Sequence, residues 1–582
     1  MKQIPPSLLK GGLLLLCAGA GLPSTTPGYA PESPYLQEPA DILLFLEEST
    51  DFWLAAWDAD DAAFYSDVSA DGSPRGSAKA FLAQTRNAYA MSKAFMVTGD
   101  GDYLGYADGA LRYMYDFGWD ERNGGWWGQA SPNGSINTGI WYNNDRWSFW
   151  QHYMLLGTSA LVEATADAYH MDWLAQGNAI NDEELWDNRP GYEGYFANAA
   201  LDWSWKSGKG FTPTVDAVTT NALTNYLMTR DPLRLQRLRD LGDNIVYMVE
   251  GDHGHVVSFP SDYDNDWQVN DGTTDTSIGH HIKTAWCLAR VFLMDPDPVY
   301  RDAAEQLMDE AWTHEGPDGL GIWDKENGIM RGTVDIFDGK VSGVADWWTV
   351  EQAVTGGLMN WYVSRKPEYL QMADEAFRFF MSYYYDYDNG EVYTKVASNG
   401  VVTNANKGDM FKAGYHSVEL FYLLYVYGNL YLHNRPVTLH YEIAEAAEDR
   451  ELHLWPVAIE DERLHILGVR KDGEPYAAYD GQARMLSIPE GQSGTFEVVF
   501  ASRYATNPPA HFDNAWWEDW FGWYFHDREA YPWVFMPETG WSYVLADGAD
   551  RAGWFYDYAR ARYFYTAEEY WPARYTVEDG WE

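Results

Sequence analysis

Two histidines stand where apolar, helix-like segments begin. His280 lies at the start of the segment 278–292, and His416 lies at the start of the segment 414–421. A ring at a helix start is held rigidly while it faces a cleft, and its unperturbed pKa of about 6.5 suits proton transfer near neutral pH. If both rings face one cavity, they form an acid–base couple. Taken singly, each is more simply interpreted as a core or capping histidine.

The composition indicates a folded protein of several domains. The chain has 582 residues, of which 46% are hydrophobic, and it contains 29 Trp and 42 Tyr. This length exceeds one compact core, so two or three domains are expected. Aromatic residues in such numbers are common in proteins that handle sugars, because flat rings stack on pyranose faces, although most of them also fill cores.

The charge is strongly acidic. Against 87 Asp and Glu there are only 40 Lys and Arg, which gives a formal net charge of −47. No basic surface is available to neutralise phosphates, so nucleic acid is excluded as a partner, and acidic membranes are disfavoured for the same reason. The excess is spread along the chain, which favours a halophilic protein with a solvating surface.

The N-terminus has the pattern of an export signal over residues 1–30. Lys2 and Lys10 flank the start of an apolar run at 13–18, and small residues follow. We therefore expect a periplasmic, secreted or cell-surface protein. Cys17 leaves an N-terminal lipid anchor open as the only membrane attachment, since no later run reaches ~18 apolar residues. If cleavage removes Cys17, only Cys287 remains and no intrachain disulfide forms.

The turns repeat along the first three quarters of the chain. The pattern D-x-x-N-G occurs at 120–124, 324–328 and 386–390, and each copy is followed by a second glycine turn and then by an aromatic helix. Asn-Gly and Asp-Gly favour the positive φ that tight hairpins need. Recurrent helix–hairpin–helix units stack side by side. The sequence therefore predicts an all-α (α/α)6 toroid over 38–435, with its hairpins gathered around a central pocket.

Near residue 436 the periodicity changes from that of helices to alternation. Segments at 436–443, 464–469 and 494–500 alternate apolar and polar residues, which predicts a β-sandwich domain over 436–505. Gly-Trp pairs and dense aromatic runs follow, which predicts a small aromatic-rich β module over 510–582. This tail is interpreted either as a surface-attachment or glycan-contacting module, or as a self-packed β-meander.

The motifs of the toroid together resemble the N-acylglucosamine 2-epimerase superfamily, which includes cellobiose 2-epimerases. The resemblance covers about residues 40–435. It rests on the order and spacing of Gln84-x-Arg86 with Thr98-Gly99-Asp100, the hairpin from Asp120 to Trp126, Gly279-His280 with Ala285-Trp286, Trp347-Trp348, and Lys407 followed by Tyr415-His416. The family fold is an (α/α)6 barrel, in agreement with the repeats.

The resemblance implies a carbohydrate epimerase or isomerase. Family members transfer the proton at C2 of a reducing sugar through a cis-enediol, without a cofactor or a metal. Carried over to this chain, His280 and His416 are the two bases and Arg86 stabilises the enediolate. The substrate is a mono- or oligosaccharide. The candidate sugar-binding residues are Lys283, Trp347, Trp348, Trp147, Trp126 and Tyr415.

Three sequence elements depart from the family pattern. Lys283 stands where a glutamate usually follows the first histidine, and Val218 and Asn221 stand where a His-x-x-Glu element is expected. The stretch 347–352 lacks its glutamine and glutamate in the usual register. We expect Lys283 to contact a sugar hydroxyl or oxyanion rather than to orient the imidazole of His280.

Two other classes of protein remain open. A glycoside hydrolase or lyase on the same toroid needs paired carboxylates. Candidates for that pair are Asp145, Asp216, Asp264, Asp346 and Asp409. A non-catalytic glycan-binding surface protein is the third class. The acidic stretch 262–266 and the pair His253 and His255 are interpreted as loop residues and not as metal sites, because a complete ligand set is missing.

The charge predicts a salt dependence of stability. The Debye length, beyond which repulsion between like charges is screened, is ~3 Å at 1 M salt and ~30 Å at 0.01 M. Repulsion between the acidic residues is therefore much weaker at high salt. The Tm is therefore expected to rise steeply between these concentrations, as measured by thermal unfolding in NaCl. A flat or falling Tm would remove the halophilic interpretation.

Overall fold

The computed structural model describes residues 29–131, 134–251, 253–259, 261–270, 272–433, 435–445, 447–456 and 464–502, and most strand residues between 515 and 581. All but the last two residues of the predicted export signal, including Cys17, lie outside these ranges. Within the described residues, no helix combines the length and apolar character needed to cross a membrane.

Six inner helices form a closed ring. In chain order they are α4 (Phe81–Thr98), α6 (Ser148–Thr165), α8 (Phe211–Ala217), α11 (Ile278–Met294), α13 (Trp347–Ser364) and α15 (Tyr415–Tyr427). Each packs on the next, and α15 packs back on α4. A π-helical turn, η4 (Val218–Ala222), and α9 (Leu223–Thr229) continue α8, and η6 (Gly428–Leu432) continues α15. These helices are buried on nearly all sides, as helices inside a larger fold are. The predicted helical toroid is confirmed.

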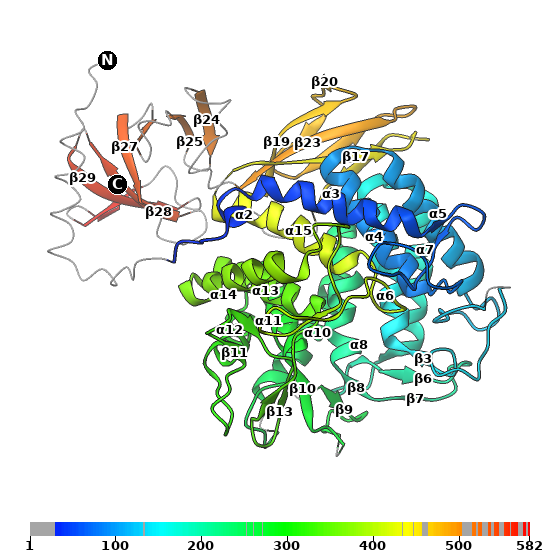
Figure 1. Ribbon diagram of the computed structural model, residues 1–582. Helices are drawn as coiled ribbons and strands as arrows, with labels where there is room; N and C mark the ends of the chain where they lie inside the picture. Colours follow the sequence, from blue (N-terminus) through cyan, green and yellow to red (C-terminus); the bar gives the residue numbers. More distant parts are fainter. Residues whose placement is uncertain are drawn as a thin grey trace.

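Outer helices cover the ring of inner helices (Figure 1). They are α3 (Leu43–Phe52), α5 (Asp102–Gly118), α7 (Ala168–Ile180), α10 (Pro232–Glu250), α12 (Pro298–Thr313) and α14 (Pro367–Phe379). The outer helices pair with α15, α4, α6, α9, α11 and α13, in that order. Three of them begin with a proline, whose fixed φ suits the first helical turn. Two short segments precede α3, α2 (Pro34–Gln37) and η1 (Pro39–Ile42), and η2 (Trp53–Ala56) follows it.

The D-x-x-N-G turns have one local structure in all three copies. The aspartate accepts hydrogen bonds from the backbone N–H two residues on and from the asparagine side chain, and the glycine has a φ of +73°, +66° or +75°. Each aspartate also binds a cation, in the pairs Asp120–Arg146, Asp324–Arg331 and Asp386–Lys407. The repeated sequence therefore encodes a repeated turn, and these turns join outer helices to inner ones.

Short antiparallel strands lie in the loops at one end of the ring (Figure 1). The two-stranded pairs are β1 (Trp57–Asp58) with β2 (Ala63–Phe64), β4 (Trp186–Asp187) with β5 (Gly194–Tyr195), β8 (Lys209–Gly210) with β9 (Asp262–Tyr263), β11 (Trp323–Asp324) with β12 (Ile329–Met330), and β15 (Lys395–Val396) with β16 (Val402–Asn404). The three-stranded sheets are β3 (Arg146–Trp147), β6 (Asn198–Ala199) and β7 (Lys206–Ser207), and β10 (Asp275–Ser277), β13 (Thr333–Asp335) and β14 (Val341–Ser342).

A β-sheet lies at the opposite end of the ring (Figure 1). Its antiparallel strand order is β17 (Val437–Ile443), β23 (Gly494–Ser502), β19 (Leu464–Lys471) and β20 (Glu474–Pro475). Strand β17 contacts α4 and α6, and its His440 ring lies against Gly99 where α4 ends. A second sheet has the order β18 (Arg450–His453), β22 (Met485–Ile488) and β21 (Tyr479–Asp480). The first sheet therefore covers the C-terminal ends of two inner helices.

The aromatic tail forms one antiparallel meander in chain order. Its strands are β24 (Ala515–Asp519), β25 (Gly522–His526), β26 (Trp533–Met536), β27 (Gly540–Leu545), β28 (Ala552–Asp557), β29 (Arg562–Ala567), β30 (Tyr575–Thr576) and β31 (Gly580–Trp581). Cross-strand aromatic pairs such as Phe555 with Phe564, stacked at 5.2 Å between ring centroids, stabilise it.

The contact between α4 and α6 depends on Gly157. A Cβ there would lie 2.3 Å from the carbonyl oxygen of Thr85, whereas a Cβ on the exposed Gly105 of α5 would touch nothing within 4 Å. Gly157→Ala is expected to cost about 1–3 kcal/mol by overpacking. Gly105→Ala is the matched control and is expected to stabilise by up to about 1 kcal/mol, because alanine loses less backbone entropy in a helix. Unfolding midpoints measured by circular dichroism test both, and equal shifts would contradict the close contact.

Candidate active site

A cavity of about 280 Å³ opens at the end of the ring where the inner helices begin. All six inner helices line it, mostly with residues of their first two turns, because their N-termini meet at this end. The lining residues are Arg86, Phe149, Tyr153, Phe211, Thr212, Asp216, His280, Lys283, Trp347, Trp348, Phe411 and His416. The structure thus brings together six residues that the sequence singled out as catalytic or sugar-binding: Arg86, His280, Lys283, Trp347, Trp348 and His416.

The two histidines share one aromatic neighbour. The centroid of the Trp348 ring lies 5.3 Å from that of His280 and 6.2 Å from that of His416. His280 also stacks on Phe211 at 3.8 Å with an interplanar angle of 16°. The indole fits here because residue 279 is glycine, since a Cβ at Gly279 would lie 2.6 Å from it. These contacts hold both rings in place around the cavity.

A glutamate binds the second histidine. The Nδ1 atom of His416 lies 3.3 Å from Oε2 of Glu351, and both side chains are buried. Glu351 follows Trp347 by four residues on α13, so both occupy one helix face. The stretch 347–352 lacks the glutamine and glutamate of the family pattern in their usual register, and the sequence did not assign Glu351 to the site. The spacing of four residues from Trp347 was the signal that could have placed Glu351 on this helix face.

The pKa values of both histidines lie below the ordinary value. Burial, with a further contribution from Lys283, lowers the pKa of His280 to about 3. Burial also lowers the pKa of His416 well below its ordinary range, with contributions from Arg86, Lys283 and Lys412. Both rings are consequently neutral at neutral pH, which is the state in which an imidazole accepts a proton.

Arg86 enters the cavity from α4. Its guanidinium lies over the ring of Tyr153 at 4.7 Å and over that of Tyr415 at 5.7 Å, and Nη1 donates to the backbone oxygen of Phe411. Its buried Nε has no hydrogen-bond partner among the described residues. The side chain is therefore held by two aromatic rings and a backbone oxygen, and Arg86 brings a positive charge to the cavity wall.

Lys283 is part of a buried ion pair. Its Nζ donates to Oδ1 of Asp216 at 2.7 Å and to the hydroxyl of Tyr153 at 3.0 Å. Burial alone would lower the pKa of Lys283, but Asp216 and Tyr153 outweigh burial and raise it. Lys283 does not bind the ring of His280. Asp216 balances the charge of Lys283. The replacement of the family's glutamate by Lys283 does not by itself reveal this partner.

Three aromatic candidates lie away from the cavity lining. The ring of Trp126 is buried against Trp119 at 4.8 Å and Trp173 at 5.8 Å. The prediction that Trp126 binds sugar is therefore contradicted, because the hairpin turns this ring into the core. The ring of Trp147 packs 5.4 Å from that of Trp141 and does not line the cavity. Tyr415 also does not line the cavity, and its ring lies edge-on to that of Tyr89 at 4.8 Å.

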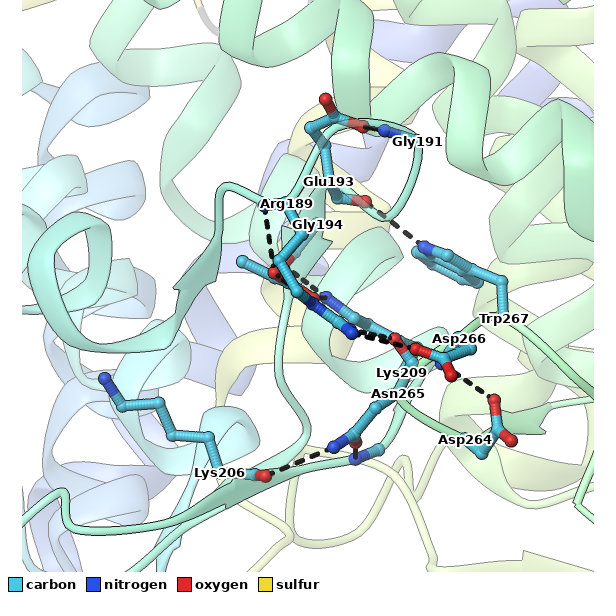
Figure 2. Close-up of polar contacts among 12 residues, drawn as sticks. Arg189, Gly191, Glu193, Gly194, Lys206, Lys209, Asp264, Asn265, Asp266 and Trp267 are labelled. Carbon is cyan, nitrogen blue, oxygen red and sulfur yellow. Dashed lines mark hydrogen bonds and ion pairs between the residues drawn. The ribbon is translucent and has the colours of Figure 1, made fainter.

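The acidic loop 262–266 is held by protein groups (Figure 2). Arg189 donates to Asp266 at 2.9 Å, Asn265 accepts from the N–H of Gly208 at 2.6 Å, and Asp264 accepts from the N–H of Asp266 at 2.8 Å. Strand β9 of this loop pairs with β8, which leads directly into Phe211. The loop thus braces the helix that supplies the ring stacked on His280.

The described residues contain one group with metal-like spacing, formed by Glu351, His416 and Glu419. Within the protein, Oε2 of Glu351 accepts from the amide of Gln352 and lies 3.3 Å from Nδ1 of His416.

The carboxylates proposed for a hydrolase are dispersed. Among the described residues that line the cavity, Asp216 is the only carboxylate. Asp346 pairs with Lys395 at 3.0 Å, and Asp409 accepts from the N–H of Phe411. Asp264 belongs to the acidic loop 262–266, and Asp145 does not line the cavity. The described lining residues therefore do not place two carboxylates across this cavity.

Comparisons with known proteins agree with this site. The family model for N-acylglucosamine 2-epimerase (GlcNAc 2-epimerase) matches residues 63–419, more than half of the chain. The chain belongs to this family, and it is an enzyme of the sugar epimerase and isomerase class. A search of curated protein sequences gave no match.

Solved structures of the class share the fold. The cellobiose 2-epimerase from Spirochaeta thermophila is 20% identical with a TM-score of 0.59, over 68% of this chain and 96% of that one. The cellobiose 2-epimerase from Bacillus thermoamylovorans is 15% identical with a TM-score of 0.57, over 67% and 99%. A D-mannose isomerase is 17% identical with a TM-score of 0.59, over 68% and 99%.

The lowered histidine pKa values predict a flat acid side of the pH–rate profile. A base whose pKa is depressed in the folded state stays neutral as the pH falls through 6.5 and is protonated only near its folded value, about 3 for His280. The unfolded chain takes up these protons near pH 6.5, so stability falls below that pH while the folded site remains unprotonated. Initial rates of proton exchange on sugar are therefore expected to be constant from pH 8 to about 5. A half-maximal rate near 6.5, with unchanged circular dichroism, would contradict this.

Proposed function

We propose that the enzyme moves the proton at C2 of a reducing sugar through a cis-enediol, giving the C2 epimer or the ketose. The observation that carries this is the pair of neutral histidines, His280 and His416, on one cavity that Arg86 also lines. A planar enediol needs a base beside it, and a second base on the other face permits epimerisation. No step requires a redox group.

The contacts suggest a role for each group. His416, bound by Glu351, removes the C2 proton, and His280 is the second base, on the other face of the enediol. The negative charge that develops on the sugar oxygen is stabilised by the guanidinium of Arg86. Trp347 and Trp348 contact the sugar. The Lys283–Asp216 pair offers a donor and an acceptor to hydroxyl groups.

The mouth of the cavity favours a substrate longer than one sugar. Trp141 and Phe411 stack at 6.2 Å with an interplanar angle of 19°, and both side chains are exposed. Phe411 lines the cavity, and its backbone oxygen holds Arg86. A second sugar stacked on this pair would place the reducing end beside the histidines, as in an oligosaccharide. This is compatible with the substrate that the name cellobiose 2-epimerase gives to two structural neighbours.

We also propose the finer organisation of the chain. The two sheets of residues 436–505 are assigned to a β-sandwich that closes the far end of the toroid, which is supported by the contact of His440 with Gly99. Residues 510–582 are assigned to an aromatic β module for surface or glycan contact. The protein is exported into salty surroundings, which is supported by the N-terminal pattern and the charge of −47.

The experiment is deuterium uptake at C2 in heavy water, followed by NMR with unlabelled mono- and disaccharides. Wild-type protein is expected to exchange this proton, and His280→Asn and His416→Asn are each expected to lower the rate by at least about 10²-fold. His253→Asn, which changes a histidine outside the cavity, is the matched control and should exchange at the wild-type rate.

Two results would overturn the proposal. The first is that wild-type protein exchanges the C2 proton of none of the tested sugars. Full activity in either cavity variant, with its circular dichroism unchanged, would remove that histidine from the mechanism.

A further inference from the structure

We propose that Trp286 and Gln352 are positioning residues that fix His416 in the tautomer with its proton on Nδ1, so that Nε2 is the basic nitrogen. The tautomer follows from the hydrogen bonds alone, whereas its importance for the rate rests on the proposed function. The chain of bonds runs from α11 through α13 to α15, across three neighbouring inner helices.

The chain begins at a group that only donates. The indole N–H of Trp286 lies 2.6 Å from Oε1 of Gln352, and both side chains are fully buried. An indole nitrogen never accepts, so the atom of Gln352 that faces it must be the carbonyl oxygen. The two ends of the Gln352 amide are thereby assigned by chemistry. Its NH2 group must point the other way, toward Glu351.

The next bond assigns one oxygen of Glu351. The NH2 group of Gln352 donates to Oε2 of Glu351, so this oxygen is an acceptor. The same Oε2 is the atom that lies 3.3 Å from Nδ1 of His416. Two acceptors cannot share a hydrogen bond, so Nδ1 of His416 must carry the proton. In a neutral imidazole the other nitrogen, Nε2, then has the free lone pair.

Protonation of Glu351 does not reverse this assignment. Burial and the neighbouring Glu419 raise the pKa of Glu351 well above its ordinary range, which favours a proton on this carboxyl group. The second oxygen, Oε1, lies 3.0 Å from the hydroxyl of Thr355, which can accept as well as donate. A proton on Glu351 is therefore best placed on Oε1, and Oε2 remains the acceptor for Gln352 and His416.

His280 has no such relay. Its ring contacts Phe211 and Trp348, and no polar partner of either ring nitrogen is found in the described part of the chain. The two histidines of the cavity therefore differ: the tautomer of His416 is set by the protein, and that of His280 is set by whatever binds in the cavity. This asymmetry makes His416 the preset base.

The direct test is the nitrogen spectrum of protein labelled with ring-¹⁵N histidine, because Nδ1–H and Nε2–H tautomers have different ¹⁵N shifts. The His416 signal is identified by its absence in His416→Asn. Wild-type protein without sugar is expected to show the Nδ1–H form alone. Gln352→Met keeps the volume and removes the amide, and it is expected to show a mixture of tautomers.

Two further variants complete the test. Trp286→Phe keeps an aromatic side chain but removes the N–H donor, so the amide of Gln352 can reverse its orientation, and a mixture of tautomers is again expected. Gln371→Met is the matched control, because Gln371 also donates to a glutamate, Glu375, at 2.7 Å but lies on outer helix α14. It should leave the His416 signal unchanged.

The outcomes separate this inference from the proposed function. An Nε2–H form in wild-type protein, or an unchanged Nδ1–H form in both Gln352→Met and Trp286→Phe, would overturn the relay. If the tautomers behave as expected, the C2 exchange rate should fall about 10-fold or more in Gln352→Met, with unchanged circular dichroism. If they behave as expected but no sugar is exchanged by wild-type protein, the relay stands and the proposed function fails.

Discussion

The structure depends on pairing the polar groups that the ring of helices buries. A charge removed from water is costly unless a partner compensates it, and here the partner usually comes from another element of the fold. Lys93 of α4 pairs with Glu163 of α6 at 2.6 Å, and Lys283 of α11 pairs with Asp216 of α8 at 2.7 Å. These pairs fix how neighbouring helices sit, and the cavity is the space they leave.

The same burial produces the chemistry of the site. Removal from water keeps the two cavity histidines neutral, so they can accept protons at a pH where exposed histidines begin to be charged. Arg86 supplies the positive charge that a developing oxyanion requires. Its guanidinium lies over aromatic rings, and among the residues that the structure describes no carboxylate forms an ion pair with it.

The structure explains why Lys283 can stand where the family usually has a glutamate. A lysine at that position would be an uncompensated charge if nothing else changed, but Asp216 on the adjacent helix neutralises it. The orienting carboxylate of the site is then Glu351, which binds the other histidine. The cavity therefore keeps donors, acceptors and a histidine-bound glutamate, although their positions along the sequence differ from the usual family pattern.

The sequence by itself determined the ring, because the D-x-x-N-G turns and the spacing of apolar helices are local patterns with a direct conformational meaning. It also placed His280 and His416 on one cavity, because each lies at the beginning of an inner helix, and the family resemblance added Arg86. Only the tertiary structure decided the partners. The Asp216–Lys283 pair, the orientation of Trp126 into the core and the bond from Glu351 to His416 all join residues far apart in the chain or depend on side-chain direction, which no local pattern records.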